Sequence, residues 1–188
     1  GARVGTSSLR RKCQILKQRP DLNIIDLRGN VGTRLSKLDQ GQYDAIILAS
    51  AGLKRLGLNE RIRHTLLPQM SLPAVGQGAL GLECRSDDHA LLELIAPLAH
   101  EHTSACVRAE RAFNAYLEGG CQVPIAGYAT LDHDLLTLEG RVGSVKGDIL
   151  LKDIVQGHPD QAEALGIQLA KQLLEQGAGD LLRELYRD

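Results

Sequence analysis

The first seventy residues alternate between short apolar runs and amphipathic runs, and this alternation restricts the fold more than any other feature. The apolar runs predict strands at residues 2–6, 23–27 and 45–49. The amphipathic runs predict helices at residues 7–18, 31–39 and 51–56. Because strands that alternate with helices over short links form parallel sheets, we expect an α/β domain with helices on both faces of its sheet.

The remainder of the chain has a different order of elements. An amphipathic run at residues 103–117 precedes three strand-like runs and two final helical runs. The strands are predicted at residues 126–131, 135–142 and 149–155, and the final helices at 160–175 and 179–186. Helix, antiparallel strands and helices in this order predict a small α+β domain with a three-stranded antiparallel sheet.

The stretch between these two parts is rich in Gly and Pro at residues 71–85, where it also becomes strand-like, and then helical at 87–98. We interpret it as a crossover that leaves the first domain. The expected organisation is therefore an α/β domain over residues 1–72, a crossover segment over 73–98 and an α+β domain over 99–188.

The net charge of −1 conceals an asymmetry between the two halves of the chain. Residues 1–63 contain 13 Lys and Arg against 5 Asp and Glu, whereas residues 64–188 contain 9 against 18. A basic half predicts an anionic partner. Because the chain has only 3% aromatic residues and no Trp, it lacks side chains for base stacking, and a small polycarboxylate or phosphate fits better than nucleic acid.

The sequence has no apolar run near the ~20 residues of a membrane-spanning helix. It opens on Gly1 without a methionine and passes at once into the first predicted strand, which favours a piece of a longer protein. The four cysteines form no C-x-x-C pair and have no zinc-like spacing with histidine, so we expect neither a disulfide framework nor a metal site. A reducing, cytoplasmic location follows as an expectation.

Arginines recur at or beyond the carboxyl end of each predicted strand of the first domain. They are Arg10, Arg11, Arg28, Arg34 and Arg55. Arg10 and Arg11 fall in the first turn of a helix, where the helix dipole disfavours cations unless an anion is present. Thr6, Ser7 and Ser8 precede them and offer hydroxyls beside free backbone N–H groups. One polyanionic ligand shared by these arginines explains the repetition better than separate surface charges.

One cysteine lies in an unusual setting, the loop EGGCQVPI at residues 118–125. Gly119 and Gly120 leave Cys121 without helical neighbours to pack against, whereas the other three cysteines lie on apolar stripes or beside strand residues. Cys121 is therefore a candidate nucleophile or attachment point. Since no histidine is close to it in sequence, a protease-type triad is not indicated.

Five motifs together resemble the porphobilinogen deaminase (hydroxymethylbilane synthase) family. They are VGTSSLRR, LRGNVGTRL with KLD, AIILA with AGLKRLG, LPAVGQGALG and LEGGCQVPI, in this order and spacing. The resemblance covers all 188 residues and corresponds to the second and third domains of the family. The family's N-terminal domain has no counterpart here except the returning segment around residues 79–98.

The resemblance implies an enzyme that joins four porphobilinogen units head to tail, releases ammonia at each step and yields hydroxymethylbilane for tetrapyrrole and haem synthesis. It implies a dipyrromethane cofactor attached by a thioether to Cys121. The residues that would contact cofactor and substrate are Thr6, Ser7, Ser8, Arg10, Arg11, Arg28, Arg34, Ala49, Gly52, Arg55 and Gln77. The family's catalytic aspartate lies in the N-terminal domain, so no catalytic residue is assigned, and the chain alone is expected to be an inactive monomer.

Two other functions remain open from the residues alone. A non-enzymatic polycarboxylate-binding module, similar to periplasmic-type binding proteins, would use the same arginines but would bind its ligand reversibly and leave Cys121 unmodified. Nucleic-acid binding by the basic half would show an affinity that falls steeply with added salt. The scarcity of aromatic residues and the acidic second half argue against the latter.

Overall fold

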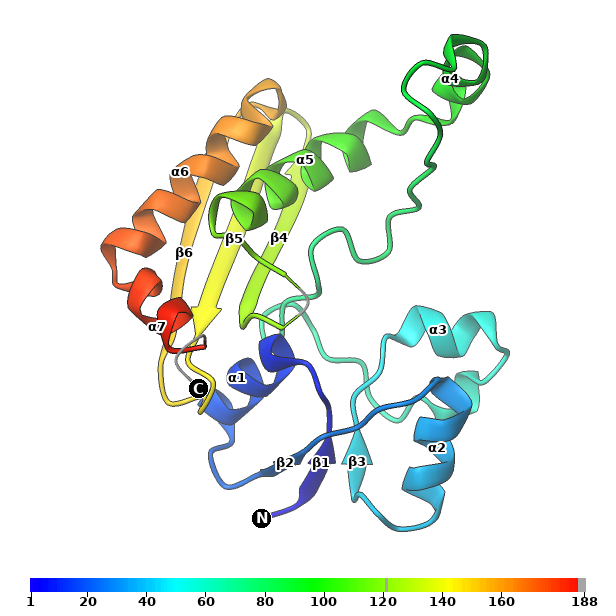
Figure 1. The fold of residues 1–188 in the computed structure, drawn as a ribbon, viewed down its shortest axis with the longest axis vertical. Coiled ribbons are helices and arrows are strands. Elements are labelled where there is room, and N and C mark those ends of the chain that lie inside the picture. Colours follow the sequence, from blue (N-terminus) through cyan, green and yellow to red (C-terminus); the bar gives the residue numbers. More distant parts are fainter. Residues whose placement is uncertain (121, 186–188) are drawn as a thin grey trace.

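The computed structural model describes residues 1–120 and 122–185, which form two units with one sheet each (Figure 1). The first unit has a parallel three-stranded sheet and the second an antiparallel three-stranded sheet. A long connection runs between them on one side of the molecule (Figure 1). The predicted fold class, α/β followed by a small α+β domain, is confirmed. Among the described residues, no helix is both long and apolar enough to cross a bilayer.

The parallel sheet consists of β1 (Arg3–Gly5), β2 (Asn23–Ile25) and β3 (Ala45–Ile46), in the order β2-β1-β3. The central strand pairs with both neighbours, so that Val4 lies opposite Ile24 on one side and Ala45 on the other. Because all three strands run in the same direction, their carboxyl ends meet at one edge of the sheet.

A helix follows each strand of this sheet. The helices are α1 (Leu9–Gln18), α2 (Val31–Asp39) and α3 (Ser50–Arg55). The side chain of Ser8 accepts a hydrogen bond from the first turn of α1, and that of Asn30 does the same for α2. Helix α1 lies toward the antiparallel sheet, whereas α2 and α3 lie on the β3 side (Figure 1).

The connection begins after a single 3-10 turn, η1 (Asn59–Arg61), and reaches α4 (His89–Ile95) and the 3-10 turn η2 (Ala96–Leu98). The strand-like pattern expected within residues 71–85 forms no strand in the part of the chain that the structure describes. The reason is that a strand needs a hydrogen-bonding neighbour, and Leu80 in this segment is 86% exposed. Figure 1 shows α4 projecting away from both sheets.

The antiparallel sheet has the order β4-β5-β6, and two long helices lie side by side over one of its faces (Figure 1). The elements are α5 (Glu101–Tyr116), β4 (Ile125–Asp132), β5 (Leu135–Gly143), β6 (Leu150–Gly157), η3 (Pro159–Gln161), α6 (Ala162–Glu175) and α7 (Ala178–Glu184). Most of the buried apolar side chains of the protein lie between these helices and this sheet, so the second unit holds the larger core.

Glycines allow the close packing of this core around Phe113, which is fully buried. Gly127 and Gly140 lie opposite each other on β4 and β5. A Cβ atom at Gly140 would lie 2.7 Å from the Cζ atom of Phe113, and one at Gly127 would lie 2.9 Å from its Cδ1 atom. The paired glycines therefore form a depression in the sheet that receives the aromatic ring.

Candidate anion-binding site

The amino-terminal ends of α1 and α2 follow the carboxyl ends of β1 and β2, as the predicted topology requires. Neither helix has an acidic residue in its first turn, and the shorter α3 has none either. Carboxylates are favourable at such positions because they compensate the positive end of the helix dipole. The electrostatic potential at this edge of the sheet is therefore positive, and no acidic side chain in the first turns of these helices neutralises it.

The three hydroxyl residues after β1 shape the start of α1. Thr6 is buried, and its Oγ1 atom accepts a hydrogen bond from the backbone N–H of Ser8. Ser7 donates from Oγ to the carbonyl oxygen of Leu27 at 2.8 Å. Ser8 is the N-cap residue, and its Oγ atom accepts from the N–H of Arg11 at 3.4 Å. These contacts fix the turn from which the two arginines of α1 project.

Arg10 and Arg11 occupy the first turn of α1 as predicted, and each is held by a distant carbonyl group. Arg10 donates from Nη1 to the carbonyl oxygen of Leu72 at 2.5 Å. Arg11 donates from Nη1 to the carbonyl oxygen of Ile47, directly after β3, at 2.9 Å. Each guanidinium group has five N–H donors, so these contacts orient the groups and leave other donors for a ligand.

Burial and mutual repulsion make these cations unfavourable without an anion. Burial, followed by the charge of Arg11, lowers the pKa of Arg10 to about 10. Burial, followed by the charge of Arg34, lowers the pKa of Arg11 as well. Both remain charged at neutral pH, and a nearby anion would relieve their repulsion and part of their desolvation. Arg34 donates from Nε to the carbonyl oxygen of Gly29 at 2.6 Å, which holds it at the start of α2.

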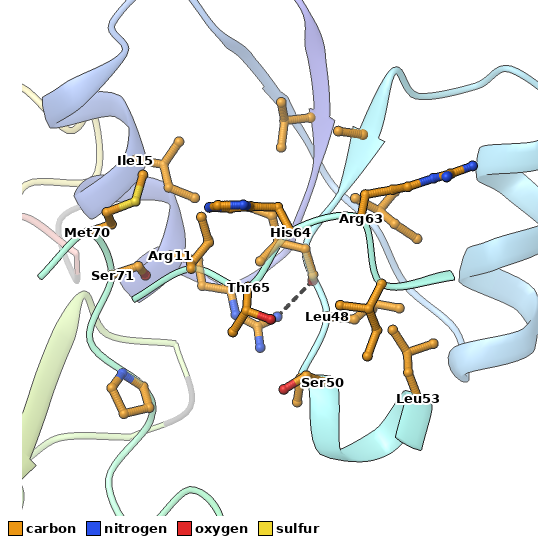
Figure 2. Close-up of a pocket in the computed structure, with 18 of the residues that line it drawn as sticks. Arg11, Ile15, Leu48, Ser50, Leu53, Arg63, His64, Thr65, Met70 and Ser71 are labelled. Atoms are coloured by element: carbon orange, nitrogen blue, oxygen red, sulfur yellow. Dashed lines mark hydrogen bonds between the residues drawn. The ribbon is translucent and has the colours of Figure 1, made fainter. Parts of the chain in front are cut away.

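A cavity of about 630 Å³ adjoins Arg10 and Arg11, between α1, β3 and the residues that follow η1. Figure 2 shows Arg11, His64 and Thr65 near the middle of this cavity. Ser50 and Leu53 of α3 lie at one side of it (Figure 2). Such a volume is in the range of small-molecule sites.

The other predicted site residues lie in less enclosed positions. Arg28 is exposed and pairs with Asp26 at 3.5 Å, and Arg55 is exposed in the last turn of α3. Ala49 is the N-cap residue of α3 and lines the cavity. Gly52 follows it in the first turn, where an added Cβ atom would meet nothing closer than 3.9 Å.

Gln77 lies in the turn that follows the Leu72 contact. Its Oε1 atom accepts a hydrogen bond from the N–H of Ala74 at 3.2 Å, and the residue lines the cavity. The structure thus brings Arg10, Arg11, Ala49 and Gln77 to one cavity. The other predicted contact residues are not among its lining residues; they are Thr6, Ser7, Ser8, Arg28, Arg34, Gly52 and Arg55.

Sequence reasoning did not select Ser50, Arg63 and His64, which also line the cavity. Ser50 opens α3 directly after Ala49 and could have been recognised as the hydroxyl at the third helix start. The basic run Arg61-Ile62-Arg63-His64 offered a charge signal, but it lies outside a strand end and therefore outside the pattern used.

Cys121, the proposed attachment residue, lies outside the described residues. The chain on both sides of it is anchored to the C-terminal core. Asn114 donates from Nδ2 to the carbonyl oxygen of Gly119 at 3.1 Å, and the carbonyl oxygen of Pro124 accepts from the N–H of Gly143 at 3.0 Å.

The other three cysteines are free thiols, with Cys13 fully buried. Within the described ranges, no cluster of acidic, His and Cys side chains could hold a metal ion.

The fold and the site together define a class: a two-domain protein whose α/β unit places arginines beside helix amino termini, as an anion-binding domain does. Residues 1–93 match the family described as "Porphobilinogen deaminase, dipyromethane cofactor binding domain". Residues 104–175 match "Porphobilinogen deaminase, C-terminal domain". The chain therefore belongs to the porphobilinogen deaminase family, transferases of tetrapyrrole and haem biosynthesis, and contains the domain that binds the dipyrromethane cofactor.

The residues of the site fit this cofactor. Dipyrromethane made from porphobilinogen carries acetate and propionate groups, so it needs cations and N–H donors. Arg10 and Arg11 are desolvated cations with spare donors, and the starts of α1 and α2 contain no acid that would repel a carboxylate. The charge and hydrogen-bonding capacity of the site thus match the ligand that the family binds.

Proposed function

We propose that this protein acts as a hydroxymethylbilane synthase, condensing four porphobilinogen units head to tail with release of ammonia. The observation that carries the proposal is the series Arg10, Arg11 and Arg34, in which burial and mutual repulsion lower the pKa of the first two. A growing pyrrole chain that gains two carboxylates with each porphobilinogen unit needs several cations to bind it, and these arginines lie at the carboxyl edge of the parallel sheet. A purely structural arginine would instead be expected to pair with an acid or lie in solvent.

The residues that would hold the cofactor are those predicted from the sequence. They are Thr6, Ser7, Ser8, Arg10, Arg11, Arg28, Arg34, Ala49, Gly52, Arg55 and Gln77, with Cys121 as the point of covalent attachment. When bound, dipyrromethane supplies the primer to which substrate units are added. A thiolate is a suitable attachment group because it is a strong nucleophile toward electron-poor carbon.

The protein's own contribution is to bind and orient carboxylates. Arg11 is held toward β3 by the carbonyl oxygen of Ile47, and Arg10 toward the connection by that of Leu72. Arg34, at the start of α2, extends the cationic edge along the sheet. Orientation by fixed hydrogen bonds lowers the entropy lost when a ligand carboxylate is bound.

The general acid or base of the reaction is not assigned to this chain. The resemblance places the catalytic aspartate of the family in its N-terminal domain, and the returning segment around residues 79–98 is the part of this chain that corresponds to that domain. We therefore propose that residues 1–72 bind the cofactor, that 73–98 contact that further domain, and that 99–188 carry the attachment loop. The 188 residues by themselves, a monomer in this proposal, are expected not to turn over porphobilinogen. A cytoplasmic setting is part of the same proposal.

Intact-mass measurement tests the attachment. The purified chain, incubated with porphobilinogen and a separately produced N-terminal domain of the family, should gain the mass of two pyrrole units. The added mass should lie on the peptide that contains Cys121 and react with Ehrlich-type reagent. Cys121→Ala should abolish the gain, whereas Cys84→Ala, at a half-buried position in the connection, should retain it.

The alternatives give different results in the same experiment. Reversible binding of porphobilinogen without any gain in mass would favour a non-enzymatic anion-binding module. A gain that persists in Cys121→Ala would refute the assignment of the attachment residue. Release of ammonia should require the added N-terminal domain, and turnover without it would contradict the proposed location of the catalytic acid.

A further inference from the structure

Strand β5 carries a buried arginine whose guanidinium group bridges the two units of the protein. Arg141 is 5% exposed. Glu139, on the same strand, accepts from its Nε at 2.8 Å and lies 2.7 Å from its Nη2, so the charge is paired locally. The guanidinium group also donates from Nη2 to the carbonyl oxygens of Pro68 and Gln69, at 3.3 and 3.2 Å, and from Nη1 to Oε1 of Gln14 on α1, at 2.9 Å. One buried side chain thus joins the antiparallel sheet to the connection and to α1.

Gln14 extends this contact to the anion site. It is fully buried, and its Oε1 atom also accepts from the N–H of Leu72 at 2.8 Å. Its Nε2 atom donates to the carbonyl oxygen of Leu72 at 3.3 Å and to that of Arg10 at 3.0 Å. The same Leu72 carbonyl oxygen accepts from Nη1 of Arg10. A continuous series of hydrogen bonds therefore runs from Arg141 through Gln14 and the carbonyl oxygen of Leu72 to the Arg10 guanidinium.

The packing of α1 against the C-terminal domain restricts the helix independently of this series. A Cβ atom at Gly143, the last residue of β5, would lie 2.5 Å from the Sγ atom of Cys13. A Cβ atom at Gly147 would overlap the side chain of Leu16. Helix α1 therefore rests directly on the backbone of the second unit. Lys17 donates to the carbonyl oxygen of Asp148 at 2.9 Å and fixes the far end of the helix.

We propose that Arg141 is a positioning residue for the anion site, which acts through Gln14 and the carbonyl oxygen of Leu72 to set the orientation of the Arg10 guanidinium. This inference rests on the proposed function, because it requires Arg10 to bind a carboxylate. With one donor of Arg10 held by Leu72, the others face a fixed direction, and less rotamer freedom is lost when a ligand binds. The C-terminal domain thereby contributes to carboxylate affinity from a residue that need not touch the ligand.

A double-mutant cycle separates positioning from simple stabilisation. The probe is butane-1,2,3,4-tetracarboxylate, titrated into the 188-residue chain by calorimetry. Arg141→Met should weaken probe binding about fivefold when Arg10 is present and less than about twofold in the Arg10→Met background. An equal loss in both backgrounds, or no loss in either, would overturn the inference.

Matched variants control for charge and folding. Arg183→Met removes the same charge from an exposed position on α7 and should leave probe affinity unchanged. Arg141→Lys retains a cationic donor and should have an affinity between those of the unsubstituted chain and Arg141→Met. If Arg141→Met does not fold, the same cycle is measured with Arg141→Lys, whose loss should likewise disappear in the Arg10→Met background.

Hydrogen exchange provides a readout without any ligand. The N–H of Leu72 is protected by Gln14, so its exchange should be faster in Arg141→Met than in Arg183→Met. Unchanged exchange would exclude the series of hydrogen bonds as the means of positioning. If the unsubstituted chain does not bind the tetracarboxylate, both the proposed anion site and this inference are refuted. If it binds the tetracarboxylate without coupling between Arg141 and Arg10, only this inference is refuted.

Discussion

Ser7 and Leu27 are joined by a two-way hydrogen bond: the Ser7 Oγ atom donates to the carbonyl oxygen of Leu27 at 2.8 Å and accepts from its N–H at 3.0 Å. Both residues lie just beyond the paired ends of β1 and β2. The hydroxyl group therefore continues the sheet's hydrogen bonding past the last strand residues. It connects the loop that leads to α1 with the loop that leads to α2, the two helices that carry Arg10, Arg11 and Arg34.

Replacing this hydroxyl group should destabilise the first unit. Ser7→Ala leaves both polar groups of the Leu27 peptide without this partner, and we expect a loss of about 1–3 kcal/mol in the free energy of unfolding. Ser104→Ala, at an exposed position on α5, should change it by less than about 0.5 kcal/mol. Urea denaturation of both variants measures the difference. Equal stabilities would show that solvent replaces the Ser7 contacts without cost.

The arginines of α1 should determine carboxylate affinity more than the net charge does. Arg11→Met keeps much of the apolar stem but removes the guanidinium group, and tetracarboxylate affinity should fall about tenfold or more, since a hydrogen bond to a charged group contributes about 1.5–3 kcal/mol. The affinity of the variant should also depend less on salt. Arg28→Met, which removes an exposed guanidinium paired with Asp26, should have a smaller effect. The same loss in both variants would refute an oriented role for Arg11.

Glu110 should make stability depend on pH. Its buried carboxylate accepts from the N–H groups of Gly76 at 2.6 Å and Ala129 at 2.8 Å. Burial raises its pKa above the ordinary value of 4.5, although both hydrogen bonds oppose the rise. Because the folded state binds the proton of Glu110 more tightly than the unfolded state does, protonation stabilises the fold. This stabilisation is fully present below pH 4.5 and is lost as the pH rises through the raised pKa.

Glu110→Gln tests both the contacts and the titration. The amide has one acceptor oxygen and cannot serve both N–H groups in the same way, so we expect a loss of about 1–3 kcal/mol at pH 7. The unsubstituted chain should gain stability relative to the variant as the pH falls from 8 toward 4.5. Denaturation curves across this range, with the exposed Glu163→Gln as a control, measure the effect. Parallel pH profiles for the unsubstituted chain and Glu110→Gln would contradict the raised pKa.

The close contact between α1 and β5 should not tolerate a methyl group. Gly143→Ala would place a Cβ atom 2.5 Å from the Sγ and 2.6 Å from the Cβ atom of Cys13, and overpacking of this kind costs about 1–3 kcal/mol. Gly81→Ala, where an added Cβ atom has open space, should be neutral or slightly stabilising. Thermal unfolding compares the two. A neutral Gly143→Ala would mean that α1 can shift away from β5.

Much of the fold follows from local patterns. The spacing of Val31, Leu35 and Leu38 predicted a helix at residues 31–39, and α2 has these bounds. The first-turn positions of Arg10 and Arg11 follow from the bounds of α1 in the same way. The strand predicted at 45–49 is shorter in the structure, since only Ala45 and Ile46 form the β3 ladder. Apolar character marks a segment for burial, but pairing depends on which neighbour is present.

The sequence by itself determined the order of helices and strands and the repetition of arginines near the strand ends, because periodicity and residue type act over a few neighbouring positions. Only the tertiary structure decided that Leu72 meets Arg10, that Arg141 reaches Gln14 across the two units, and that Gly127 and Gly140 accommodate Phe113. Such contacts join residues far apart along the chain. They arise from how buried surfaces and polar groups satisfy one another after the elements have packed, and no local pattern encodes that outcome.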